Sequence, residues 1–258
     1  MKNKKKNLKI DKKRAILLDE DAPFAVRESF GLLRTNIIYT RTDGSGAPVF
    51  GITSAEEGAG KSTIIANLGL SFAQIEKKVL IIDADMRCPR QYDFFGYPKE
   101  NVGLSEILVG MVKDKSDAIF KTSNKYLDVI SSGHLPPNPS ELILSSRFEE
   151  LINELKTEYD FIFIDFPPVG VVADALSVVS IMSGYIFVIR ANVSDYVRVT
   201  EIIENFEKVN ANISGIVLSD VNLKDGIFAS KYKRNGYGRY GKYGKYSKYS
   251  NYNKQKKS

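Results

Sequence analysis

The chain has 258 residues, and 43% of them are hydrophobic, which is enough to build one full α/β core. Its one cysteine, Cys88, excludes an internal disulfide and suits a reducing compartment. No apolar run approaches the roughly 18–20 residues that span a bilayer, and no signal-peptide hydrophobic region follows the first lysines. We therefore expect a cytoplasmic protein, whose association with a membrane would be peripheral or borrowed from a partner.

The net charge of +6 combines three regions of different sign. Residues 1–14 hold eight basic residues and one acid, and residues 231–258 hold ten basic residues and no acid. The remaining residues, 15–230, hold 19 basic and 30 acidic residues, a net charge of −11. The pattern predicts an acidic body with two solvated basic arms, each able to contact an anionic surface or the body itself.

A phosphate-binding loop is predicted within Val49–Thr63, after a helix expected over Ala22–Arg41. A short β-prone run leads into a loop rich in small residues, and an apolar-periodic segment begins at Lys61. Loop amides and a helix N-terminus suit an anion, Lys61 can reach the β- and γ-phosphates, and the Ser62 hydroxyl can bind Mg²⁺. A chance glycine-rich turn before a helix is the alternative. The predicted ATP-binding residues are Glu57, Gly58, Ala59, Gly60, Lys61, Ser62 and Thr63.

Three carboxylates are expected at the ends of two buried parallel strands. The continuous apolar runs 78–83 and 161–165 end in Asp83 and Asp165, and Asp85 follows two residues after Asp83. Ligands bind at the carboxyl ends of strands in open α/β sheets, so these side chains can converge on one site. Asp165 has the Walker B form and would hold Mg²⁺, while Asp83 and Asp85 could add a metal contact and a base. Capping of the following turns is the alternative for both.

The alternation of strands and helices predicts an α/β fold with a doubly wound, mostly parallel sheet, as in P-loop NTPases. Three prolines make residues 135–139 a loop, and Ser140 is expected to cap the next helical stretch, which extends to Leu155. The remaining predicted elements are helices over 103–110, 171–182 and 196–209, and strands over 126–130, 185–190 and 213–218.

The C-terminal segment differs from the body. From Ala229 on there is no Val, Ile, Leu, Met or Phe, so we expect a disordered tail over 229–258. We place one domain over 21–228 and a flexible arm over 1–20. Half of the chain's 14 tyrosines lie in the tail, most of them three residues apart, a spacing that fits neither helix nor strand. They are Tyr232, Tyr237, Tyr240, Tyr243, Tyr246, Tyr249 and Tyr252. Phosphorylating them would cancel or invert the tail's charge and release it from the body. The alternative is a tail that binds nucleic acid.

Taken together, these motifs resemble the bacterial tyrosine kinases of capsule and exopolysaccharide synthesis, over roughly residues 22–258. The motifs that carry the resemblance are LLRTN at 32–36, IIDADMR at 81–87, PPNPSEL at 136–142, DFPP at 165–168 and the tyrosine cluster. The resemblance implies an ATP- and Mg²⁺-dependent protein-tyrosine kinase that modifies its own C-terminal tyrosines and regulates polysaccharide synthesis and export. It implies that Lys61 and Ser62 bind phosphate and Mg²⁺, Asp83 acts as base, and Asp85 and Asp165 support the metal.

The same resemblance implies partners: a transmembrane polysaccharide co-polymerase that activates the kinase, a cognate tyrosine phosphatase, protein-tyrosine substrates, and no specific nucleic acid. It also implies a homo-oligomeric ring in which the tail of one subunit enters its neighbour's site. The family's Glu-x2-Arg-x2-Arg pattern supports ring contacts, and here Glu28 and Arg34 fit it while Gly31 takes the middle place. Glu57 stands where the family often has proline.

Two other functions compete with this interpretation. Min/Par-like ATPases, which act as positional switches, resemble the fold but carry a second, signature lysine where this chain has Glu56. A nucleotide-gated scaffold with a polyanion-binding tail is a non-enzymatic alternative. The sequence leaves open whether Arg87 touches phosphate or a neighbouring carboxylate.

Overall fold

The computed structural model describes residues 17–19, 22–40, 46–99 and 101–221. All helices and strands given below lie within residues 1–219, the first of the chain's two units. The seven tail tyrosines and most of the N-terminal arm lie outside the described residues, so the predictions made for them remain predictions.

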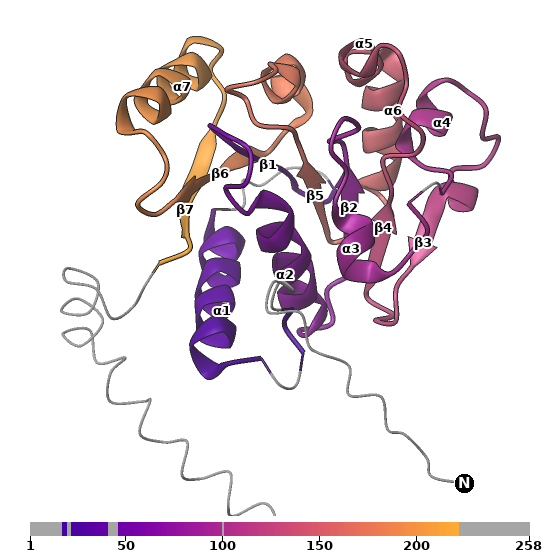
Figure 1. Ribbon diagram of the computed structural model, residues 1–258. Helices are drawn as coiled ribbons and strands as arrows, with labels where there is room; N and C mark the ends of the chain where they lie inside the picture. The colour runs from indigo at the N-terminus through magenta and orange to yellow at the C-terminus, as the bar shows by residue number, and fades with distance from the viewer. Residues whose placement is uncertain (1–16, 20–21, 41–45, 100, 222–258) are drawn as a thin grey trace, which may run out of the picture. The chain divides into compact units, whose positions relative to one another are not determined.

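One sheet organises the described part of the chain (Figure 1). Its seven strands run in the order β3-β4-β2-β5-β1-β6-β7, and every neighbouring pair is parallel except β3 and β4. β1, β2 and β5 are buried along their whole length, which explains their continuous apolar runs. The predicted fold class is confirmed. The strands are β1 Val49–Ser54, β2 Val79–Asp83, β3 Ile119–Lys121, β4 Leu127–Ile130, β5 Phe161–Asp165, β6 Gly184–Arg190 and β7 Ile213–Ser219.

Helices cover both faces of this sheet (Figure 1). They are α1 Phe24–Tyr39, α2 Lys61–Ala73, α3 Gln91–Phe95, α4 Leu104–Leu108, α5 Pro139–Ile143, α6 Ser146–Leu155 and α7 Tyr196–Lys208, with 3₁₀ helices η1 Lys115–Ala118 and η2 Asp174–Ile181. None of the helices in the described residues is long and apolar enough to cross a membrane.

Two aromatic clusters fill the core, one on each face of the sheet. Under α1 and α2, the Phe72 ring lies 4.3 Å from that of Phe161 and 5.4 Å from that of Phe163. On the other face, Phe206 of α7 meets Tyr185 edge-on, with ring centroids 5.1 Å apart. Edge-to-face and tilted pairs are favourable arrangements of aromatic rings. These clusters fix the strands whose carboxyl ends carry the site.

The proline-rich loop ends at Asn138, one residue earlier than predicted. Pro139 is the first residue of α5, a position where a missing N–H costs nothing. Asn138 is the N-cap, so the prediction that Ser140 caps this helix is wrong. The helix predicted to run on to Leu155 is interrupted between Ile143 and Ser146.

Other boundaries also differ from the prediction. The helix predicted over 171–182 is a 3₁₀ helix over Asp174–Ile181, with non-helical backbone at Val178. The sequence did not predict α3, η1 or β3, each of only three to five residues, because such elements are too short to show a period.

The first helix packs on the second through a polar contact. Arg34 Nη1 donates to the backbone oxygen of Ser71 at 2.5 Å and to its hydroxyl at 2.9 Å. Glu28 lies exposed on the same helix. Arg34 is therefore used within the subunit, and the ring contacts predicted for Glu28 and Arg34 remain a prediction.

Helix α1 continues through Gly31. A Cβ added at Gly31 would meet nothing within 4 Å, whereas one at Gly51 in β1 would lie 2.7 Å from the Tyr185 ring. We predict that Gly31→Ala raises the free energy of unfolding by about 0.5–1 kcal/mol, because alanine loses less backbone entropy in a helix. The matched variant Gly51→Ala should lower it by about 1–3 kcal/mol through overpacking. Urea unfolding measures both, and equal effects of the two variants would contradict the packing described here.

Candidate active site

The phosphate loop joins β1 to α2 and takes a conformation that requires glycine. Gly58 has φ +72° and Gly60 has φ +93°, in the left-handed region that side chains rarely adopt. Gly60 is also the N-cap of α2, so the chain turns directly into the helix whose N-terminal N–H groups point at the loop. This is the strand–loop–helix geometry expected of an anion cradle.

Segments from the far end of the chain hold this loop from outside. The Ser219 hydroxyl at the end of β7 donates to the Ala59 backbone oxygen at 2.6 Å. Arg190 at the end of β6 reaches the Gly58 backbone oxygen at 3.5 Å. The Ser194 hydroxyl donates to the Glu56 carboxylate. No local pattern predicts these contacts, because they join residues more than 130 positions apart.

A pocket of about 360 Å³ opens in front of the loop, a size typical of small-molecule sites. Its wall contains most of the residues predicted to bind the nucleotide and the metal, and α3 and its preceding turn supply much of the rest. The lining residues are Glu57, Gly58, Gly60, Lys61, Ser62, Thr63, Asp85, Cys88, Arg90, Asp93, Phe94 and Pro168. Ala59, Asp83 and Asp165 are fully buried and do not line it.

Asp83 and Asp165 form a buried pair behind this wall. They end the adjacent strands β2 and β5, where they are partners in register. Asp83 Oδ2 accepts hydrogen bonds from the backbone N–H groups of Arg90 and Gln91, both at 3.1 Å. Asp165 Oδ2 accepts one from Gln91 Nε2 at 2.7 Å. The Oδ1 atom of each has no hydrogen-bond partner among the described residues.

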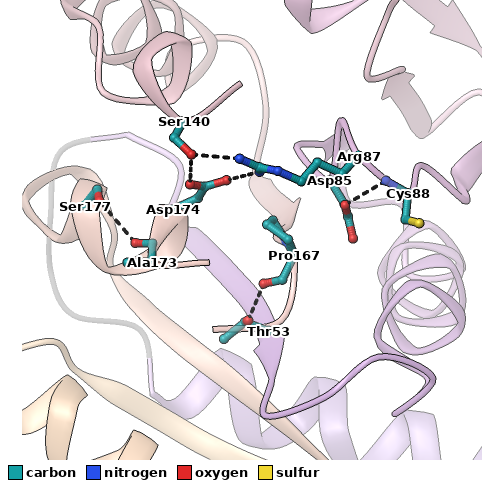
Figure 2. A network of polar contacts seen from close by, with 9 residues as sticks. All are labelled: Thr53, Asp85, Arg87, Cys88, Ser140, Pro167, Ala173, Asp174 and Ser177. Atoms are coloured by element: carbon teal, nitrogen blue, oxygen red, sulfur yellow. Dashed lines mark hydrogen bonds and ion pairs between the residues drawn. The ribbon is translucent and has the colours of Figure 1, made fainter. Parts of the chain in front are cut away.

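Asp85 lies apart from this pair and reaches the pocket. Its Oδ1 accepts a hydrogen bond from the Cys88 backbone N–H at 3.0 Å (Figure 2). Asp83 and Asp85 therefore do cap the turn that follows β2, as the alternative interpretation held. Capping nevertheless leaves Asp83 Oδ1 free, so it does not account for the whole arrangement.

Burial dominates the electrostatics of the three carboxylates. It raises the pKa of Asp83 well above its ordinary value, and the negative charge of Asp165 raises it further. Burial also raises the pKa of Asp165 to about 6, against the lowering effects of the Lys61 charge and of the hydrogen bond from the Gln91 side chain. The pKa of Asp85 is raised by burial too. Carboxylate oxygens with free lone pairs are ligands that Mg²⁺ prefers, so the donor set fits this cation.

The raised pKa values predict how stability depends on pH without metal. Between about pH 4 and 6 the folded protein holds a proton on Asp165 that the unfolded chain has released, so stability falls as pH rises through this window. In EDTA, Asp165→Asn should therefore gain stability over the wild type as pH rises from 4 to 7, by up to about 3 kcal/mol. Chemical denaturation at several pH values measures the difference. A difference that does not change with pH would contradict it.

Arg87 contacts a carboxylate of its own subunit. Its guanidinium donates to Asp174 Oδ2 at 2.8 Å and to the Ser140 hydroxyl at 2.9 Å, and that hydroxyl donates to Asp174 Oδ1 at 2.6 Å (Figure 2). Asp174 is only 3% exposed. The triangle ties the turn after β2 to α5 and η2, and thereby holds the segment that carries Asp85.

A double-mutant cycle tests this triangle. Arg87→Met should lower the free energy of unfolding by about 1–3 kcal/mol, because it leaves the buried Asp174 carboxylate with Ser140 as its remaining partner here. Adding Asp174→Asn should cost less than the sum of the two single changes, since both remove the same ion pair. Strict additivity in guanidinium unfolding would show that the pair does not interact.

The structure thus brings together Lys61, Ser62 and Asp85 at the pocket, with Asp83 and Asp165 directly behind. It also adds a residue that the sequence did not predict. Gln91 is fully buried and contacts both Asp83 and Asp165. An uncharged side chain in a stretch without a predicted element gave no signal for that contact.

A phosphate loop on a parallel sheet, with carboxylates at the ends of neighbouring strands, defines a P-loop nucleotide-binding protein. The AAA-domain family model matches residues 48–223. The tyrosine-protein kinase YwqD of Bacillus subtilis is 35% identical over 210 residues, which cover 81% of this chain and 85% of YwqD. The tyrosine-protein kinase CpsD of Streptococcus agalactiae is 36% identical over 195 residues, 76% of this chain and 83% of CpsD.

Comparison with solved structures also points to tyrosine kinases. The kinase domain of the Escherichia coli tyrosine kinase ETK superposes with a TM-score of 0.70 at 28% identity, over 79% of this chain and 84% of that one. The chain therefore belongs to the family of bacterial tyrosine-protein kinases. The resemblance inferred from the motifs is confirmed.

Proposed function

We propose that this protein is an ATP-dependent tyrosine autokinase that phosphorylates its own C-terminal tyrosines, in trans between subunits. The observation that supports this best is the pocket itself, where the phosphate loop and Lys61 face Asp85 with Asp83 and Asp165 close behind. The relatives are named tyrosine-protein kinases, which supports tyrosine as the acceptor of the phosphoryl group.

The loop residues would hold the nucleotide phosphates. The amides of residues 57–63 surround the anion, and Lys61 adds a positive charge next to the transferred group. The Ser62 hydroxyl, Asp85 and Asp165 would hold Mg²⁺, which when bound neutralises charge on the phosphates. The phenol oxygen then attacks the terminal phosphorus, the bond to the ADP oxygen breaks, and a carboxylate takes the phenol proton.

We assign Asp83 as the base that takes the phenol proton, and Asp85 as a catalytic residue that contacts the bound ligand in the pocket. Asp83 has a free Oδ1 but is fully buried, so an incoming hydroxyl reaches it only if the wall in front opens. Asp85 lines the pocket at 7% exposure and meets a ligand without such a change. Comparing the kinase activities of Asp83→Asn and Asp85→Asn therefore distinguishes a base that lies behind the pocket wall from a residue that contacts the ligand in the pocket.

The proposed setting is the regulation of capsular or exopolysaccharide synthesis and export. A transmembrane co-polymerase would recruit and activate the kinase, a tyrosine phosphatase would reverse the modification, and copies of the chain would form a ring. Phosphorylation at about −1.5 to −2 charges per tyrosine would offset the ten basic residues of segment 231–258 and release it from an acidic body.

The central test is to incubate the protein with ATP, Mg²⁺ and the activator segment and to map modified residues by mass spectrometry. We predict phosphotyrosine within 232–252 that falls at least about 100-fold in Lys61→Met, through loss of charge stabilisation at the transferred phosphoryl group, and falls strongly in Asp83→Asn. Deleting the residues after Ser230 should abolish labelling and leave ATP binding intact. ATP hydrolysis without phosphotyrosine would contradict the proposal.

The same experiment addresses the Min/Par-like ATPase. In those proteins a signature lysine stands in the loop, but here the position is Glu56, whose carboxylate is bound by Ser194 of the same chain. An acid held in this way offers no positive charge to a nucleotide across an interface. Nucleotide-dependent dimerisation with hydrolysis alone would favour the switch.

A further inference from the structure

Gln91 has an unusual environment for an uncharged side chain. It is the first residue of α3 and is fully buried. Its Nε2 donates to Asp165 Oδ2 at 2.7 Å and to the Ser62 backbone oxygen at 3.3 Å, while its Oε1 has no partner among the described residues. Burying a primary amide is costly unless it is hydrogen-bonded, so a half-satisfied amide here calls for an explanation.

The contacts of Gln91 join three separate parts of the site. Its side chain links the start of α2, through Ser62, to the end of β5, through Asp165. Its backbone N–H adds the end of β2, through Asp83. One residue therefore touches the phosphate loop and both members of the buried carboxylate pair.

These contacts select which carboxylate oxygens remain free. Gln91 occupies Oδ2 of Asp83 and Oδ2 of Asp165, and on both residues it is Oδ1 that lacks a partner. The two residues are in register on adjacent strands. The bond to Asp83 comes from the Gln91 backbone, next to a second one from the Arg90 N–H, whereas the bond to Asp165 comes from the Gln91 side chain. Without that side chain, the Asp165 carboxylate could rotate about its terminal torsion, which is broad for aspartate.

We propose that Gln91 is a positioning residue whose side chain orients Asp165 so that its Oδ1 atom faces a divalent cation. This inference rests on the proposed function for the cation itself. Gln91 also begins α3, whose Asp93 and Phe94 line the pocket, so one residue connects the pocket wall to Asp165. Residues that orient metal ligands typically change metal affinity about 10- to 100-fold when they are lost.

A purely structural role predicts a different outcome. If Gln91 only anchored α3, its loss would weaken the whole pocket and would lower nucleotide affinity with and without metal by the same factor. If it orients Asp165, the nucleotide should bind as before in the absence of metal, and only the cation should bind more weakly.

The test uses Gln91→Met, which keeps the side chain's length and removes its amide. Electron paramagnetic resonance measures Mn²⁺ affinity in the ADP complex of the full chain, and calorimetry measures ADP affinity in EDTA. We expect a 10- to 100-fold weaker Mn²⁺ affinity and an ADP affinity within about twofold of the wild type. Gln91→Asn has a side chain one methylene shorter, which moves the amide away from Asp165, and it should give an intermediate loss of Mn²⁺ affinity. This variant replaces Gln91→Met in the test if the Met variant does not fold.

Gln74→Met is the matched control. Gln74 is exposed at the end of α2, and within the described residues its side chain donates to the Leu18 backbone oxygen at 3.5 Å. It should leave both affinities unchanged. Unchanged Mn²⁺ affinity in both Gln91 variants, or equal losses with and without metal, would overturn the inference. A wild-type ADP complex that does not bind Mn²⁺ would instead overturn the proposed metal site.

Discussion

The structure depends on one electrostatic constraint: two carboxylates, Asp83 and Asp165, are buried side by side at the ends of β2 and β5. Burial and mutual repulsion both disfavour their charge, so in the absence of a cation this pair opposes folding. The aromatic layers on both faces of the sheet provide the stability that such a pair requires. A cost of this kind is typical of a functional site, where local rules are broken for the sake of binding.

The surrounding contacts can be understood as a frame for that pair. Gln91 and the backbone N–H of Arg90 donate hydrogen bonds to the Oδ2 atoms of the two carboxylates. The Arg87–Asp174–Ser140 triangle holds the turn that follows β2. On the opposite side, Ser219 and Arg190 hold the phosphate loop. The site is thus built from rigid strand ends and braced loops, which is the arrangement that positions a phosphoryl group for in-line transfer.

The sequence predicted much of this because the decisive signals are local. Continuous apolar runs identified the parallel strands, and the Gly-Lys-Ser turn and strand-end aspartates identified the site. What it missed depends on three-dimensional proximity. Gln91, Ser194 and Ser219 have no distinctive spacing, and Arg87 could be placed only once η2 was seen beside it. Short elements such as α3 lack a period, and α5 began earlier because proline suits the first helical turn.

Under the proposed function, this site transfers phosphate to the tail of another copy of the chain. Mixing two variants tests it most directly: a full-length Lys61→Met chain, which keeps the tyrosines, and an active chain truncated after Ser230, which lacks them. With ATP, Mg²⁺ and the activator segment, we expect phosphotyrosine within residues 232–252 of the Lys61→Met chain, although neither variant is labelled alone. A mixture that hydrolyses ATP and yields no phosphotyrosine would contradict it.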